Sequence, residues 1–127
     1  MAGGNVPLER QVQRAILRMC GTCFPDVLIH HSAVVKLTGS AKQRGMQMGA
    51  MKGDGFKVGF PDLLCLWSGG AAFMEIKRAK GGVVSEDQEK MLARLSEMGW
   101  PASVIRSVDE AHAFLKAAGA PCKGELQ

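Results

Sequence analysis

The sequence predicts an α/β fold in which a mixed β-sheet is flanked by helices. Two apolar runs separated by Ser68-Gly69-Gly70 predict a β-hairpin. Later in the chain, two capping-box patterns open helices on either side of a short strand. The chain has 127 residues, of which 46% are hydrophobic, and this suits one layered domain with a single core. We expect its core to span about residues 6–119 and to be followed by a frayed tail, residues 120–127.

The first elements are a helix and a strand. Asn5 and Pro7 are typical of a helix start, and apolar residues at helical spacing extend this helix to about Cys20. Residues Val27 to Leu37 are rich in β-branched and apolar side chains, which predicts a strand. A short helix over Ala41 to Met51 is also expected, although its glycines weaken the pattern.

The second half alternates helices and strands after the hairpin. One capping box opens a helix at Ser85, and this helix ends near Gly99. Pro101 to Arg106 predicts a short strand, and a second capping box opens a helix at Ser107 that ends at Gly119. The expected order is α-β-(α)-β-β-α-β-α, which contains an α-β-β-β-α-β core.

The positive charge is concentrated in one segment. The formal net charge is +4, and the segment from residue 36 to residue 57 accounts for all of it. A concentrated basic segment suits a polyanion, and the alternative is a solvated loop. The basic residues, which oppose Asp54 alone, are Lys36, Lys42, Arg44, Lys52 and Lys57.

Other classes of protein are disfavoured. No stretch approaches the ~20 apolar residues that span a bilayer, and the start of the sequence shows no signal peptide, so we expect a cytoplasmic location. Cys20 and Cys23 form a CxxC, but this motif follows a helix, unlike a thioredoxin motif. Zinc would need His30 and His31 as well, and neighbouring strand residues point to opposite faces. Ordinary half-buried thiols are therefore expected.

Two carboxylates can be placed opposite each other by counting along the hairpin. With the turn centred on Ser68-Gly69, Cys65 faces Ala72 and Asp62 faces Glu75. Directly opposed residues in an antiparallel pair have Cβ atoms roughly 4.5–5.5 Å apart. Two carboxylates at that spacing repel each other unless a cation lies between them, so this register predicts a metal site.

Lys77 completes the predicted site. Because side chains alternate along a strand, Glu75 and Lys77 point to the same face while Ile76 points to the other. Hard oxygen ligands favour Mg²⁺ or Mn²⁺, and an ammonium group beside them can act on water or phosphate. In the alternative reading, Asp62 caps a turn while Glu75 and Lys77 form a surface ion pair.

Two further residues each have two readings. Glu9 lies at the edge of the apolar stripe of the first helix, where it can reach a site or simply favour the helix dipole. Gln88 occupies a core-facing position, and a buried amide needs partners. The carboxylates or a substrate phosphate would supply these partners, although pairing with Ser85 in the cap could suffice.

The motifs resemble those of a known family. Gly59-x-Pro61-Asp62, the hairpin, and Glu75-Ile76-Lys77 resemble the PD-(D/E)XK nuclease superfamily. The addition of a Gly-Gly pair at residues 81 and 82, Ser85-x-x-Gln88 and a leucine-bearing helix is similar to its VRR-NUC branch. The resemblance covers about residues 59–118 well and the N-terminal half only loosely.

The resemblance implies a restriction-endonuclease-like core and metal-dependent cleavage of DNA. It implies that the backbone carbonyl of Ile76 is a further metal ligand, that Glu9 completes the metal shell, and that Gln88 belongs to the active site. Stand-alone members look like homodimeric nucleases that resemble Holliday junction resolvases. Cleavage of flaps or ends, and DNA binding without catalysis, are the alternatives. The expected phosphate contacts are Lys36, Lys42, Arg44, Lys52, Lys57, Arg78 and Lys80.

Overall fold

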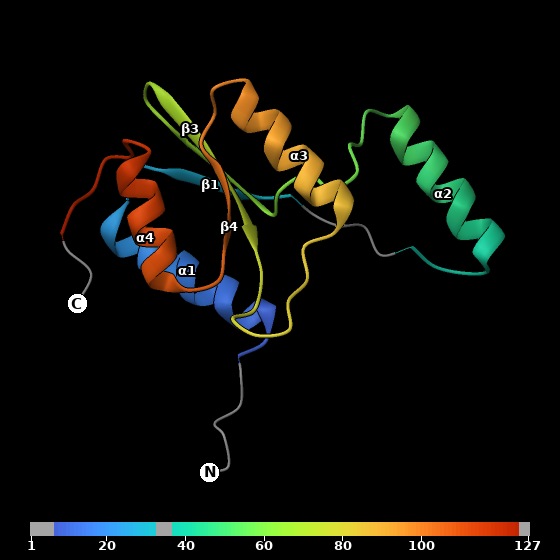
Figure 1. The fold of residues 1–127 in the computed structure, drawn as a ribbon, viewed down its shortest axis with the longest axis horizontal. Coiled ribbons are helices and arrows are strands. Elements are labelled where there is room, and N and C mark those ends of the chain that lie inside the picture. Colours follow the sequence, from blue (N-terminus) through green and yellow to red (C-terminus); the bar gives the residue numbers. More distant parts are fainter. Residues whose placement is uncertain (1–6, 33–36, 125–127) are drawn as a thin grey trace, which may run out of the picture.

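A four-stranded mixed sheet forms the centre of the molecule (Figure 1). The computed structural model describes residues 7–32 and 37–124. The strands lie in the order β1-β2-β3-β4, with antiparallel pairing except between β3 and β4, which are parallel. This arrangement confirms the predicted mixed α/β class. The strands are β1 (Leu28–His31), β2 (Leu63–Trp67), β3 (Gly70–Ile76) and β4 (Ala102–Ile105).

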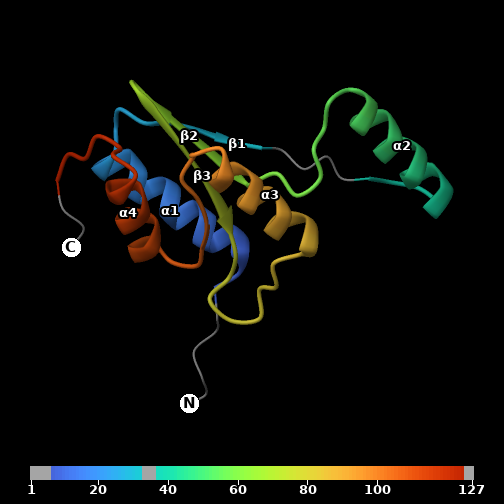
Figure 2. The ribbon, with the colours of Figure 1, turned by 45° about the horizontal axis from the view of Figure 1, so that its top comes forward.

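Helices cover both faces of this sheet, and one helix stands apart. The helices are α1 (Glu9–Cys23), α2 (Ala41–Gly53), α3 (Glu86–Glu97) and α4 (Val108–Ala117). Helices α1 and α4 pack together on one face, while α3 covers the other face beside β4. Helix α2 projects from this layered body in both ribbon views (Figures 1 and 2). No helix of the described residues is long and apolar enough to cross a membrane.

Side-chain alternation along β3 divides the core in two. Ala72, Met74 and Ile76 point into the main core with α1 and α4. Ala71 and Phe73 point to the opposite face, where they pack in a smaller cluster that includes Leu95 of α3. Glu75 points to the same face as Ala71 and Phe73, so its side chain lies on the α3 face of the sheet.

The hairpin has the predicted register. Trp67 pairs with Gly70, and Cys65 pairs with Ala72. Gly69 has a φ of 90°, which a residue with a side chain rarely adopts. A Cβ atom at Gly70 would lie 2.5 Å from the Trp67 indole nitrogen, so glycine is required there for the ring to fold over the turn.

The bounds of α1 and β1 differ from the predictions. Helix α1 begins at Glu9 and continues to Cys23, so the CxxC lies in its last turns. Strand β1 covers only residues 28–31 of the expected strand 27–37. Its partner β2 begins at Leu63, directly after Pro61 and Asp62, and proline has no N–H to extend the ladder. Residues 33–36 lie outside the described part.

The cysteines are more buried than expected. Cys20, Cys23 and Cys65 are all at most 4% exposed and belong to the main core, so the half-buried prediction is wrong for Cys20 and Cys23. Burial raises the pKa of both Cys20 and Cys65 to about 12, with a neighbouring thiol adding to each rise. Such thiols are protonated and unreactive at neutral pH.

The described part of the tail is fixed to the body. Ala120 is buried, and the backbone N–H of Lys123 donates to the Cys23 carbonyl at 2.7 Å. The Lys123 ammonium lies 3.2 Å from Asp26. Ala120 and Lys123 therefore contact the body within the segment 120–127 that is predicted to fray, and the Lys123 contact caps the end of α1. Residues 125–127 lie outside the described part.

Candidate active site

The end of the hairpin brings Asp62 and Glu75 together. Leu63 pairs with Met74, so the next position along each strand places Asp62 opposite Glu75. The backbone N–H of Ile76 donates to Asp62 Oδ2 at 2.8 Å, which fixes the aspartate against β3. The structure thus brings the two carboxylates to the opposed positions that the register predicts.

Glu75 is a buried carboxylate with an incomplete set of partners. It is 1% exposed, and its Oε2 accepts from the side-chain amide of Gln88 at 3.1 Å. Its Oε1 has no hydrogen-bond partner among the described residues. Burial raises the pKa of Glu75 to about 8, and the adjacent Asp62 adds to the rise while Lys77 opposes it. An acidic pair that a single ammonium group compensates only in part is suited to bind a cation.

Lys77 lies beside this pair. Its Nζ is 3.7 Å from Glu75 Oε2, and its side chain is 11% exposed. The strand ends here, and the Lys77 N–H donates to the Ile105 carbonyl of β4 at 3.0 Å. The ion pair is therefore largely buried at the end of the sheet, and the predicted alternative of a surface ion pair does not describe this contact.

Gln88 plays both of the roles that the sequence left open. Its Oε1 accepts from the Ser85 N–H at 2.9 Å, while its backbone N–H donates to the Ser85 hydroxyl at 3.1 Å. The remaining end of the amide, Nε2, reaches Glu75. The capping box of α3 thereby orients the amide that holds the carboxylate.

Gly59 allows α3 to approach the segment that leads to Asp62. Its φ is 80°, and a Cβ atom would lie 2.5 Å from the carbonyl carbon of Asp87 and 2.8 Å from the Gln88 nitrogen. Only glycine fits both the backbone conformation and this close contact. Gly59 therefore couples the positions of the aspartate and the glutamine.

Arg106 holds the loop that joins β3 to α3. Its Nη1 donates to the Arg78 carbonyl and to the Gly82 carbonyl, both at 2.9 Å. This loop starts at Lys77 and ends at the α3 cap, so both groups that contact Glu75 depend on its course. This role of Arg106 was not predicted, because the contacts join residues 28 and 24 positions apart and no local pattern marks them.

Glu9 faces the same cleft as Asp62 from the start of α1. The cleft has a volume of about 640 Å³. Among the described residues, no three His, Cys, Asp or Glu side chains are close enough together to hold a metal ion. Glu9 is thus near Asp62 without completing a three-ligand group, and its role in a metal shell stays a prediction. The residues that line the cleft are Glu9, Arg10, Gln13, Arg14, Leu17, His31 and Asp62.

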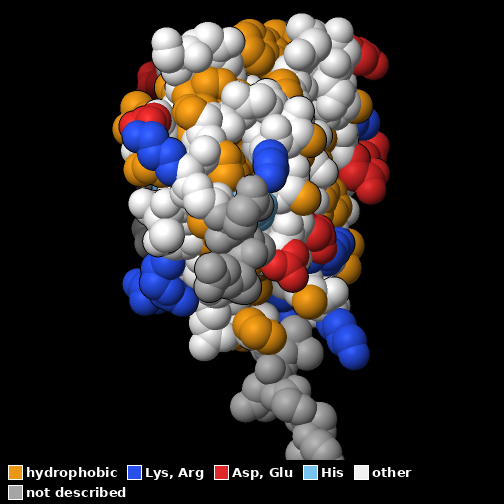
Figure 3. Space-filling model, turned by 90° about the vertical axis from the view of Figure 1, so that its left-hand side faces the viewer, with side chains coloured by type: hydrophobic (Ala, Val, Ile, Leu, Met, Phe, Trp, Pro, Cys, Tyr) orange, Lys and Arg blue, Asp and Glu red, His pale blue; other side chains and the backbone are white. Residues whose placement is uncertain are grey.

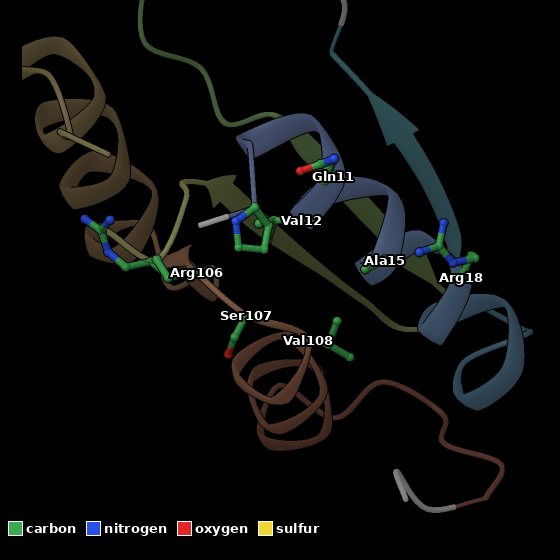
Figure 4. A pocket seen from close by; sticks show the side chains of 9 residues that line it. Gln11, Val12, Ala15, Arg18, Arg106, Ser107 and Val108 are labelled. Carbon is green, nitrogen blue, oxygen red and sulfur yellow. The ribbon is translucent and has the colours of Figure 1, made fainter. Parts of the chain in front are cut away.

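A second cleft does not suit the same chemistry. It has a volume of about 620 Å³ and lies between α1 and the start of α4 (Figure 4). Val12, Ala15 and Val108 give it apolar walls, and none of its lining residues is a carboxylate or a histidine. The pair that can bind a cation is elsewhere, so this cleft is not the candidate active site.

The predicted phosphate contacts fall into two groups. Lys77 is followed by Arg78, which is half-buried, and by Lys80, which is exposed in the loop. The remaining described residues are exposed and lie on α2 or just after it: Lys42, Arg44, Lys52 and Lys57. Lys36 lies outside the described residues. None of these four residues on or just after α2 contacts the carboxylate pair in the described structure.

Fold and site together define an α/β domain of the nuclease type. The VRR-NUC domain model matches residues 8–109, so the chain belongs to the VRR-NUC domain family, which is part of the PD-(D/E)XK nuclease superfamily. A solved structure of a VRR_NUC domain protein shares the fold, with a TM-score of 0.67 and 19% identity over 91% of this chain and 90% of that chain. No curated protein matches the chain. Membership of the family implies nuclease function with DNA as the substrate.

Proposed function

We propose that this chain is a divalent-metal-dependent, structure-specific DNA endonuclease. The observation that carries the proposal is the pair of facing carboxylates, in which Glu75 is buried and has one oxygen without a partner in the described part of the chain. Keeping two acidic groups together in a buried setting is unfavourable unless a cation compensates them. A non-catalytic binder of a polyanion gains nothing from such a pair.

The donor set fits Mg²⁺ or Mn²⁺. Asp62 and Glu75 offer carboxylate oxygens, the ligands that these hard cations prefer. In this proposal the backbone carbonyl of Ile76 is a further ligand, and Glu9 contributes from across the cleft. When bound, such an ion neutralises charge on the phosphate and lowers the pKa of a coordinated water.

The other side chains of the site act on the nucleophile and on the phosphate. Lys77 donates a hydrogen bond to the attacking water or to the phosphate oxygen that gains charge. Gln88 keeps Glu75 in one orientation through the contact at 3.1 Å. The reaction adds water to phosphorus and releases one of the two sugar oxygens, which breaks the strand.

The proposed substrate is a four-way DNA junction. The support is membership of the VRR-NUC family, whose stand-alone members look like homodimeric relatives of Holliday junction resolvases. A two-fold dimer presents two sites to two strands, which suits symmetric cleavage. Cleavage of flaps or free ends by the same site is the second candidate.

The test compares four-way junction, flap and linear duplex substrates, each labelled at one 5′ end. Purified protein is incubated with each in Mg²⁺, in Mn²⁺ and in EDTA. Paired nicks at symmetric positions of the junction support the proposal, and preferential flap cleavage supports the second candidate. Tight DNA binding without cleavage in either metal contradicts the enzyme proposal.

A further inference from the structure

Helix α2 is unpartnered within the described residues. None of its 13 residues is buried, and it stands away from the sheet in both ribbon views (Figures 1 and 2). Its start is stabilised by a capping box between Ser40 and Gln43. On one side Gln47 is tied to the backbone of Thr38 at 3.0–3.1 Å. Lys42, Gly45, Gly49 and Lys52 are all exposed and so are accessible to an external partner.

Three glycines inside α2 have no explanation within the described part of the chain. Gly45, Gly49 and Gly53 are absent from the residues with positive φ, and a Cβ atom at any of them would meet nothing within 4 Å. Each glycine costs a helix roughly 1 kcal/mol relative to alanine. A helix of this length is already marginal in isolation. A partner that approaches the helix backbone closely would account for them.

Charge indicates what that partner is. Helix α2 carries Lys42, Arg44 and Lys52 and no acidic residue. The positions 42, 45, 49 and 52 follow a spacing of three, four and three residues, which places them on one face. We define this Lys42–Lys52 face by Lys42, Gly45, Gly49 and Lys52. Two cations about 15 Å apart thus flank a flat surface, where a polyanion can approach closely.

The chain connections root the insertion that carries α2 beside the candidate active site. Helix α2 is inserted between β1 and the segment that leads to Asp62. The two ends of this insertion meet, because the Ser32 N–H donates to the Asp62 carbonyl at 2.8 Å. At the opposite end of the molecule, by contrast, cationic and anionic side chains are interspersed (Figure 3).

We infer that α2 is a DNA-binding arm whose Lys42–Lys52 face contacts the sugar-phosphate backbone of the duplex next to the cleavage site. The inference rests on the proposed function, for which it names the surface that holds the substrate. The major groove is about 12 Å wide, so lysines about 15 Å apart can reach phosphates on its two sides. A second copy of α2 is a poorer occupant, since two faces that carry only positive charge repel each other.

The test measures binding of a fluorescent duplex and a four-way junction in EDTA, where no cleavage occurs. The first variant is K42Q/K52Q, for which we expect the Kd to rise about 10- to 100-fold at low salt. Because each lost phosphate contact removes about 0.9 from the slope of log Kd against log salt, that slope should fall by about 2. K90Q on α3, where Lys90 is exposed and pairs with Glu86, is the control and should bind as the unmodified protein does.

The second variant, G45Q/G49Q, tests the close approach. Glutamine is a better helix former than glycine, and both positions have open space, so the helix should be at least as stable. We expect the Kd to rise about 10-fold with the melting temperature retained. A50Q adds the same side chain to an exposed position of α2 outside this face and should bind normally.

Two outcomes overturn the inference. The first is unchanged DNA affinity in both double variants. The second is a change from dimer to monomer in light scattering with DNA affinity retained, which would assign the face to a second copy of the chain. Failure of the proposed function is distinguishable, because the unmodified protein would then bind DNA through α2 and cleave no substrate in any metal.

Discussion

Replacing Glu75 by glutamine should make the metal-free protein more stable at alkaline pH. The pKa of this carboxyl is about 8 in the folded protein, against an ordinary value of 4.5, chiefly because of burial. The folded state therefore holds this proton more tightly than the unfolded state does. As the pH rises from about 4.5 to about 8, the free energy of unfolding falls, and glutamine removes this loss because it cannot ionise.

The size of the effect follows from the two pKa values. Each pKa unit corresponds to about 1.4 kcal/mol, which gives a ceiling of about 5 kcal/mol. Relaxation and entry of water around the charge reduce this, so we expect a gain of about 2–3 kcal/mol at pH 8.5 and little change at pH 4.5. The melting temperature at pH 8.5 should rise by roughly 5–12 °C.

Thermal unfolding in EDTA at the two pH values measures this gain. The control is E86Q, because Glu86 is 80% exposed and should show no such pH-dependent gain. Added Mg²⁺ should raise the melting temperature of the unmodified protein and not that of E75Q. An E75Q protein that is no more stable than the unmodified one at pH 8.5 would refute the argument that burial raises the pKa of Glu75.

Three further substitutions test how the site is held. Gln88→Leu removes the amide donor to Glu75, so the activity–pH profile should move to higher pH. The same substitution removes a partner of the α3 cap, which should cost about 1 kcal/mol of unfolding free energy. Gly59→Ala should cost clearly more stability in chemical denaturation than Gly69→Ala, because both have positive φ but only Gly59 meets another backbone. Arg106→Ala removes the hydrogen bonds to two loop carbonyls and should speed proteolysis of the loop at residues 78–82. An unchanged rate of proteolysis there would contradict the conclusion that Arg106 holds this loop.

The hairpin was predictable because its information is local. A glycine-containing turn with apolar runs on both sides fixes the register, and the period of two then decides which side chains share a face. Asp62 and Glu75 could therefore be placed before any coordinates were known. The same holds for Ser85 with Gln88, whose spacing defines the capping box.

The remaining parts of the site depend on contacts that no local pattern records. Arg106 reaches the β3–α3 loop from the position directly after β4, and Gly59 matters only because α3 lies against it. The separation of α2 from the body was also not predicted, since its helical pattern says nothing about what it packs against. Burial of Cys20 beyond the expected level likewise follows from the packing of α1 on the sheet.

Single-turnover cleavage of a labelled four-way junction by the unmodified protein and by D62N tests the central claim most directly. Asparagine can still accept the hydrogen bond from the Ile76 N–H, so the hairpin should fold normally while one metal-binding charge is lost. We expect Mg²⁺-dependent nicking by the unmodified protein and a rate at least 100-fold lower for D62N. Nicking that persists in EDTA, or equal rates for the two proteins, would contradict the assignment of Asp62 and Glu75 as the metal-binding pair of a nuclease.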